Sequence, residues 1–200
     1  MAVKIEIRGN ADLRKAIRRF TPDLEKALKK ELRAALLPVV RQAKGFVPAQ
    51  SPMRGWAGRS FSEGNFPTYN SSTIIAGITY TTTPSKINEN GFSSMASIQN
   101  RSAAGAIYEG AGRIGPQPWV GPKAGSKSNK VSKSNNPKAG AQFIDNLPPL
   151  VSSLKGRGRL IYRAWAGSQG RAEGAAMKAI DTAIRQFRVE AAKGVLGKAA

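Results

Sequence analysis

Two long stretches of the chain place apolar residues at helical spacing. In the first, leucines recur every four residues from Leu24 to Leu36, and Pro22 suits the first position of a helix. This spacing predicts an amphipathic helix over residues 22–45, with an apolar stripe on one face and basic residues on the other. Because a proline inside a helix removes a backbone hydrogen bond, we expect a kink at Pro38.

The second helical pattern lies near the C-terminus. Small and apolar residues recur at spacings of three or four from Ala172 to Ala191. Ser168 suits an N-terminal cap and Gly194 a C-terminal stop, so we expect a helix between them. A shorter helix is expected over residues 10–20.

Other short stretches predict strands. Apolar residues alternate with charged ones over residues 3–7, which indicates a strand with one buried face. Residues 73–83 are rich in β-branched side chains and also predict a strand. We expect two further short strands, at residues 106–109 and 160–165, and a helical turn at residues 150–154.

Two stretches show no period. Residues 48–72 are rich in glycine and proline and carry aromatic residues, among them Trp56, Phe61 and Phe66. These aromatics can pack on their own domain or on a neighbouring subunit, and we favour the former. Residues 85–103 are polar and carry no assigned element.

The apolar positions of the patterned stretches predict one shared core. Its expected members are Val3, Ile5, Ile7, Leu24, Leu28, Leu32, Leu36, Ile75, Ile78, Ile107, Ile161, Ile180 and Ile184.

Charge adds a basic arm to this picture. The 200 residues include 32 Lys and Arg against 12 Asp and Glu, a net charge of +20. We expect a single domain over residues 1–200 with an extended loop or arm at about 112–158. Residues 123–138 hold five lysines and no acid, among Ser, Asn, Gly and Pro, so they cannot form a core of their own. This arm is either a solvated linker or a segment that orders on contact with a partner or a polyanion. Candidate residues for such binding are Lys123, Lys127, Lys130, Lys133, Lys138, Arg157 and Arg159.

Several classes of chemistry are excluded or disfavoured. The chain has no Cys and no His, so it has no thiol nucleophile, no disulfide and no His-based metal site or triad. We expect no metal site, no cofactor, no small-molecule substrate and no membrane span. Residues 110–115 fit G-x-G-x-x-G, but Pro116 follows where a dinucleotide site needs a helix, so we favour a turn. Glu109 is the one acid on an apolar element beside a glycine. We favour a role for it at a subunit contact or beside Arg113 over catalysis.

The order of elements resembles a known family. The residues that carry the resemblance are a strand ending at Gly9, the helical residues 34–44 closing at Val47-Pro48, Ile107-Tyr108-Glu109-Gly110, Gln117-Pro118-Trp119-Val120-Gly121-Pro122, and Gly158-Arg159-Leu160-Ile161-Tyr162-Arg163-Ala164-Trp165. In this order they resemble the tail-completion, or head–tail joining, proteins of long-tailed phages, the minor tail component family, and most closely its actinobacterial-phage branch. The resemblance covers most of the chain except residues 84–103 and 123–140. The family usually reaches its last strand soon after the Glu-Gly turn, whereas here residues 112–158 intervene.

The resemblance implies a fold, a function and partners. It implies an α+β fold in which a small antiparallel sheet packs against the long kinked helix and the C-terminal helix, with long loops and the basic arm. It implies a structural virion protein of the neck or tail, assembled in the host cytoplasm, and not an enzyme. The expected partners are further copies of the chain in a ring, a hexamer being favoured, the neighbouring neck and tail-tube proteins, and genomic DNA in the lumen. Candidate inter-subunit residues are Trp56, Phe61, Phe66, Glu109 and Trp119.

The basic composition leaves a second hypothesis open. The chain can instead be a soluble nucleic-acid-binding protein whose Lys and Arg contact phosphate without sequence specificity. We find no recognition element for reading bases, and residues 123–138 contain no aromatic residue to stack on them. A ring that forms without nucleic acid favours the first hypothesis, and a monomer with salt-dependent DNA affinity favours the second.

Overall fold

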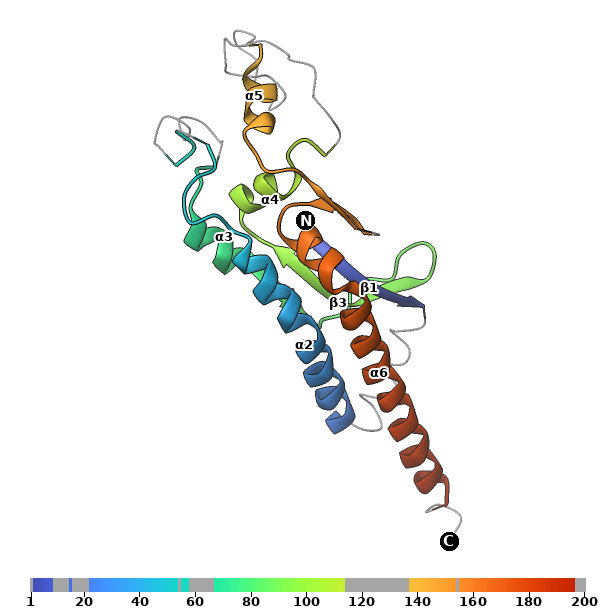
Figure 1. Ribbon diagram of the computed structural model, residues 1–200. Helices are drawn as coiled ribbons and strands as arrows, with labels where there is room; N and C mark the ends of the chain where they lie inside the picture. The colour runs from blue at the N-terminus through green and yellow to red at the C-terminus, as the bar shows by residue number, and fades with distance from the viewer. Residues whose placement is uncertain are drawn as a thin grey trace.

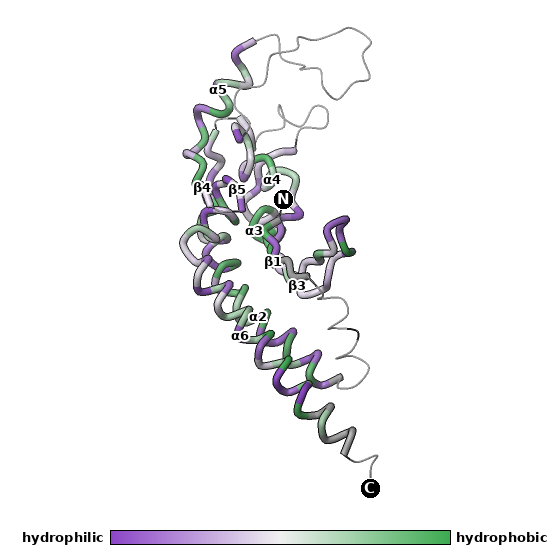
Figure 2. The backbone as a smooth tube through the Cα atoms, turned by 90° about the vertical axis from the view of Figure 1, so that its right-hand side faces the viewer, coloured by the Kyte–Doolittle hydropathy of each residue, from purple (hydrophilic) through white to green (hydrophobic). Residues whose placement is uncertain are grey.

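Two long helices cover one side of a small sheet. The computed structural model describes residues 2–8, 15, 22–53, 55–57, 67–113, 137–153 and 155–196. Helix α2 (Pro22–Gly45) and helix α6 (Ile161–Leu196) run side by side, and α6 extends past α2. Seen from the side, both helices lie on the same face of the sheet (Figures 1 and 2). The predicted α+β class is confirmed.

The sheet has three antiparallel strands. Strand β3 (Phe92–Asn100) lies in the middle, with β1 (Ala2–Arg8) on one side and β2 (Ile78–Thr81) on the other. Both neighbours are antiparallel to β3, and the register of β1 shifts between Ile5 and Glu6, which marks a bulge. The predicted N-terminal strand is therefore confirmed.

A second, smaller sheet and three short helices complete the described fold. Strand β4 (Val151–Ser153) pairs with β5 (Gly156–Gly158). The helices are α3 (Ser71–Gly77), α4 (Ala103–Gly110) and α5 (Ala139–Asp145).

Side-chain caps start two of the short helices. The Asn70 side chain accepts a hydrogen bond from the Thr73 N–H at 2.9 Å, which caps α3. The Ser102 hydroxyl accepts one from the Gly105 N–H at 3.1 Å and caps α4. Each cap satisfies a backbone donor that has no partner inside its helix.

The first long helix was predicted well from leucine spacing alone. Its range, 22–45, is confirmed, and Pro38 lies inside it. The kink at Pro38 stays a prediction. The second helix starts earlier than expected, at Ile161, because residues 161–165 form its beginning and not a strand. The expected helix at residues 10–20 lies outside the described residues except for residue 15.

Two further predictions of local structure are wrong, and a third is right only in part. Residues 106–109 belong to helix α4, and residues 150–154 contain strand β4. Residues 73–83 begin as helix α3 and only then form β2, because the Asn70 cap outweighs the β-propensity of the threonines and isoleucines. The central strand β3 was not predicted, since its serines resemble a loop in composition although Ser93, Ser94 and Ser97 are buried.

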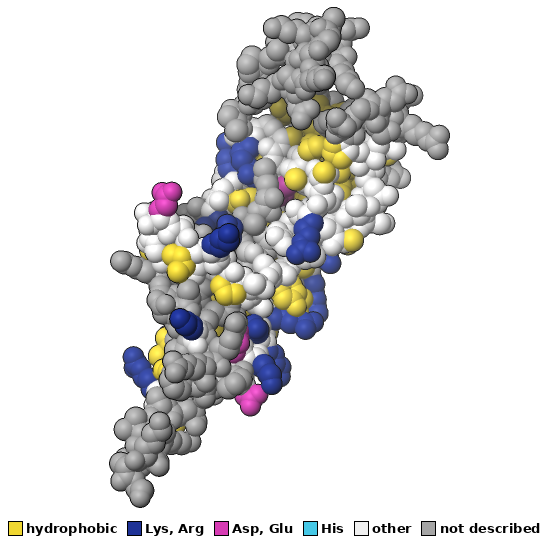
Figure 3. Space-filling view, turned by 180° about the vertical axis from the view of Figure 1, so that it is seen from behind, with side chains coloured by type: hydrophobic (Ala, Val, Ile, Leu, Met, Phe, Trp, Pro, Cys, Tyr) yellow, Lys and Arg dark blue, Asp and Glu magenta, His cyan; other side chains and the backbone are white. Residues whose placement is uncertain are grey.

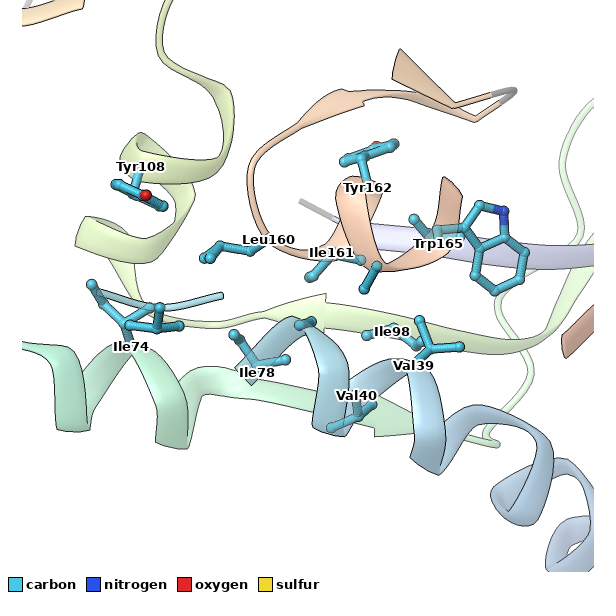
Figure 4. Packing of buried hydrophobic residues seen from close by; sticks show 14 of the residues in the cluster. Val39, Val40, Ile74, Ile78, Ile98, Tyr108, Leu160, Ile161, Tyr162 and Trp165 are labelled. Carbon is cyan, nitrogen blue, oxygen red and sulfur yellow. The ribbon is translucent and has the colours of Figure 1, made fainter. Parts of the chain in front are cut away.

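The core is split in two, contrary to the single core expected. The main cluster gathers side chains from α2, α3, β2, β3, α4 and the start of α6 (Figure 4). Its largest fully buried members include Trp56, Trp165, Leu36, Ile74, Ile78, Ile98, Leu160 and Ile161. The helix-pair cluster lies between α2 and α6 further along the two helices, with one residue of β3. It consists of Leu24, Leu28, Leu32, Met95, Ala176, Ala179, Ile180 and Ala183.

The remaining predicted core residues have different positions. Val3 belongs to the main cluster, while Ile107 and Ile184 are half-buried against the main and helix-pair clusters respectively. Ile75 is 36% exposed on α3, so its assignment to the core is wrong. The side chains of Ile5 and Ile7 lie outside the described residues.

Candidate functional site

A buried carboxylate holds the start of the longest helix. Glu109, at the end of α4, is fully buried. Its carboxylate accepts hydrogen bonds from the backbone N–H groups of Arg159 (3.1 Å), Leu160 and Tyr162 (2.9 Å). These donors lie at the start of α6, where the first N–H groups of a helix lack internal partners and the helix dipole favours negative charge. Glu109 therefore acts as the N-terminal cap of α6 from a distant part of the sequence.

Arg159 in turn caps the C-terminal end of α4. Its guanidinium donates hydrogen bonds to the carbonyl oxygens of Tyr108 (3.0 Å) and Ala111 (2.9 Å) through Nη1 and to that of Pro148 through Nε. The last carbonyls of a helix lack internal partners, and a cation is favourable there. Arg159 is itself buried. We call this reciprocal arrangement of Glu109 and Arg159 the capping joint.

A glycine makes room for the capping joint. A Cβ atom on Gly158 would lie 2.6 Å from Cδ of Glu109 and 2.9 Å from Cδ2 of Tyr162. Both distances are too short for real contacts, so the carboxylate can approach the backbone only because residue 158 has no side chain. On the outer side, the Arg113 guanidinium lies 4.8 Å from the centre of the Tyr162 ring and donates to the Arg157 carbonyl.

Burial dominates the electrostatics of the capping joint. It raises the pKa of Glu109 above its ordinary value, while the three N–H bonds and the charge of Arg113 act in the opposite direction. Burial also lowers the pKa of Arg159. The Glu109 carboxylate has no exposed surface and is bonded to its own chain, so the arrangement fits mechanical coupling of α4 to α6.

The structure brings two of the predicted site residues together and corrects their roles. Glu109 was expected at a subunit contact or beside Arg113, and Arg159 at a partner or a polyanion. Both are buried and serve their own chain, and the charge of Arg113 does act on Glu109. Trp56 is also buried, and its Nε1 donates to the Pro67 carbonyl at 2.9 Å. Its ring lies 5.1 Å from that of Phe143, so it packs in its own core and not between subunits.

The other candidates are exposed or not described. Arg157 lies exposed on β5, and Lys138 lies exposed just before α5. The remaining candidates lie outside the described residues: Lys123, Lys127, Lys130, Lys133, Phe61, Phe66 and Trp119.

The outer faces of the two long helices are basic. On α6, exposed cations recur every seven or eight residues at Arg163, Arg171, Lys178 and Arg185, which places them on one side of the helix, with Asp181 among them. Figure 3 shows the opposite face of the molecule, on the side of the sheet, where Lys and Arg side chains are also more frequent than acidic ones. Such a surface suits contact with a polyanion or with an acidic protein.

Sequence reasoning missed a groove at the edge of the sheet. The groove has a volume of 480 Å³ and lies between α2 and β2. Leu37, Val40 and Lys44 line one side, and residues 78–83 line the other. The available signal was the absence of charge, since no Asp, Glu, Lys or Arg occurs between residues 64 and 85.

Comparison with known proteins gives no match to this chain. No family model, no curated protein and no solved structure matches the chain. In the part of the chain that the structure describes, no three His, Cys, Asp or Glu residues are grouped as metal ligands. Within those same residues, no helix combines the length and apolar character that crossing a membrane requires.

Proposed function

We propose that this chain is a structural virion protein that joins head to tail in a long-tailed phage. It would form a ring at the head–tail junction or at the top of the tail tube, around the path of the DNA. The capping joint is the observation that carries the proposal. The two short motifs at residues 107–110 and 159–165, on which the family resemblance depends, meet there through Glu109 and Arg159.

The contact between these two motifs gives a physical reason for their occurrence together in the sequence. Each motif supplies the partner that the other needs, because Glu109 caps the helix that follows Arg159 and Arg159 caps the helix that contains Glu109. The joint also fixes the direction in which α6 leaves the main cluster. A rigid, directed pair of long helices on a small sheet is a shape suited to repeating around a ring.

A gene-disruption experiment tests this function directly. In the phage whose genome carries the gene, an early stop codon should give filled heads and free tails that do not join. Supplying the protein in trans should restore joined particles, and the protein should be found in purified virions. Normal joined virions without the protein would overturn the proposal.

The basic arm allows a test of what its charge contacts. DNA must be able to leave the ring, so we expect most arm lysines to face acidic surfaces of neighbouring virion proteins. Replacing Lys127, Lys130 and Lys133 together with Ser should reduce the number of joined particles and leave DNA passage unchanged in those that form. The matched control replaces three exposed lysines outside the arm and outside α2 and α6, Lys15, Lys86 and Lys155, with Ser. Normal joining with altered DNA retention or ejection would show that the arm contacts DNA.

The basic faces of α2 and α6 favour one alternative function, non-specific nucleic-acid binding. On α2, Arg33 and Arg41 are exposed, and on α6 the exposed cations share one side. A protein that works through six to ten phosphate contacts loses about 10³–10⁵ in affinity between 50 and 200 mM salt. A monomer with this steep salt dependence would favour the alternative, and a ring formed without nucleic acid would favour head–tail joining.

A further inference from the structure

The two outer strands of the main sheet differ in how they are protected. Strand β1 carries charged residues at Lys4, Glu6 and Arg8 and contains a bulge after Ile5. Charges and bulges are the usual means by which proteins prevent an open sheet edge from pairing with another chain. The β1 edge therefore has two such devices.

The β2 edge has neither device. Strand β2 and the two residues that follow it, 78–83, contain no charged residue, and residues 78–81 pair in regular register with β3. An edge strand presents backbone N–H and C=O groups on its outer side, which makes it a template for a further strand. Beside them, the buried hydroxyl of Thr79, which lines the groove, has no hydrogen-bond partner.

Apolar surface accompanies this edge. The groove beside it is lined by Leu37, Val40 and the half-buried Lys44. In the loop that follows β2, Ile87 is 57% exposed. A groove beside an open edge offers pockets for the alternate side chains of an added strand.

The distribution of charge on the chain indicates what binds at the β2 edge. The chain carries a net charge of +20, so two copies repel each other over most of their surfaces. The stretch from residue 64 to residue 85 is free of charge, so β2 itself adds nothing to that repulsion, although Lys44 lines the groove and Arg33 lies over the Tyr80 ring. An acidic partner would gain attraction at the basic faces of α2 and α6 and would gain little here.

We propose that the open edge of β2, together with the groove between α2 and β2, binds an extended segment of a second copy of this chain. The edge would gain backbone hydrogen bonds from the added strand, and the groove would cover apolar side chains of that strand. The inference deepens the proposed function, since it rests on self-assembly and assigns the surface that carries it.

A pair of matched substitutions tests the edge. Thr81→Lys places on β2 the kind of charge that protects β1, at a half-buried position. Thr182→Lys makes the same chemical change at an exposed position of α6. We expect sedimentation of the purified full chain to show self-association of the wild type and of Thr182→Lys. Thr81→Lys should weaken self-association by about tenfold or more, which corresponds to about 1.4 kcal/mol or more.

Cross-linking provides a second measurement that does not depend on how Thr81→Lys folds. Because the chain has no Cys, Thr81→Cys introduces a single attachment point for a photo-cross-linker. We expect it to join one copy to another, whereas Thr182→Cys with the same reagent should not.

Three outcomes would overturn the inference. They are a wild type that stays monomeric at all concentrations, equal self-association of Thr81→Lys and wild type, and cross-links from position 81 to other virion proteins only. The proposed function fails separately. If Thr81→Lys loses self-association but virions carrying it join normally, the edge inference stands and the joining ring does not. If self-association is unchanged while joining still requires the gene, the function stands and the edge inference does not.

Discussion

The helix-pair cluster and the main cluster use the same two long helices in different ways. In the helix-pair cluster, Leu24, Leu28 and Leu32 of α2 pack mainly against alanines and Ile180 of α6. In the main cluster, the same helices meet strands, short helices and two tryptophans. There the position of α6 also depends on the capping joint, where a carboxylate and a guanidinium are buried.

This difference determines how far the effect of a substitution in each region extends through the fold. Packing in the helix-pair cluster repeats along both helices, so the loss of one side chain leaves the contacts on either side of it in place. The capping joint has no repeat, and each of its groups satisfies several others. We therefore expect substitutions in the joint to act on the whole fold and substitutions in the helix pair to act locally.

The largest effect is expected for Glu109→Ala. This change leaves three N–H groups at the start of α6 without an acceptor and removes a negative charge that acts on the buried Arg159. Leaving a buried donor without its acceptor costs about 1–3 kcal/mol of unfolding free energy for each donor. Chemical denaturation would measure the loss, with Glu31→Ala as an exposed control on α2. A loss as small as that of the control would show that the joint does not stabilise the fold.

Leu32→Ala should be the next largest and should act locally. Leu32 is fully buried in the helix-pair cluster, so its truncation should cost about 2–5 kcal/mol. Hydrogen exchange should show faster opening of α6 around Ala176 and Ile180, with the β3 amides that pair with β1 unchanged. Leu37→Ala, at a half-buried position of the same helix, should cost less. Equal acceleration across both clusters would remove the distinction drawn between them.

The same distinction explains what the sequence could predict. Helix α2 was predicted at its observed boundaries because leucine spacing and Pro22 are local signals. Helix α4 and the start of α6 were taken for strands, because residues 106–109 and 160–165 are too short to show a period. The start of α6 at residues 161–165 is capped by Glu109, which is about 50 positions away along the chain.

The candidate site was predictable only in part. Glu109 stood out as the one acid on an apolar element beside a glycine, and its importance to the fold follows from that signal. Arg159 was named only as a candidate for binding a partner or a polyanion, because nothing local distinguishes its structural role from that of the other 31 basic residues. The groove at β2 was visible only as a lack of charge, and its open edge became apparent once β3 was found to pair with it.

Replacing a glycine of the capping joint, Gly158, and a glycine of α6, Gly174, with alanine should change the stability by smaller amounts and in opposite directions. Gly158→Ala places a methyl group against the Glu109 carboxyl and the Tyr162 ring, and such overpacking costs about 1–3 kcal/mol. Gly174→Ala adds a methyl group to an exposed position of α6, where nothing beyond the neighbouring residues and the backbone of its own helix lies within 4 Å. Because alanine favours helix more than glycine does, it should stabilise the protein by about 0.5–1 kcal/mol. Thermal unfolding of both variants would measure the difference, and equal shifts of the same sign would contradict the geometry of the joint.

The smallest expected effect is a dependence on pH that arises in the joint alone. Burial raises the pKa of Glu109 in the folded protein, against the opposing charge of Arg113 and the backbone N–H groups, with Tyr108 and Arg159 also close by. Between the ordinary pKa of a glutamate and this raised value, the folded state binds more protons than the unfolded state. The contribution of Glu109 to stability is therefore full below the ordinary value and is lost as pH rises through the raised one. Glu109→Gln cannot titrate, so the unfolding free energy of the wild type minus that of Glu109→Gln should fall as pH rises through this window. It should level off above the window. A difference that rises with pH would show that the three N–H bonds and Arg113 outweigh burial, and that the carboxylate caps α6 in its charged form at no electrostatic cost.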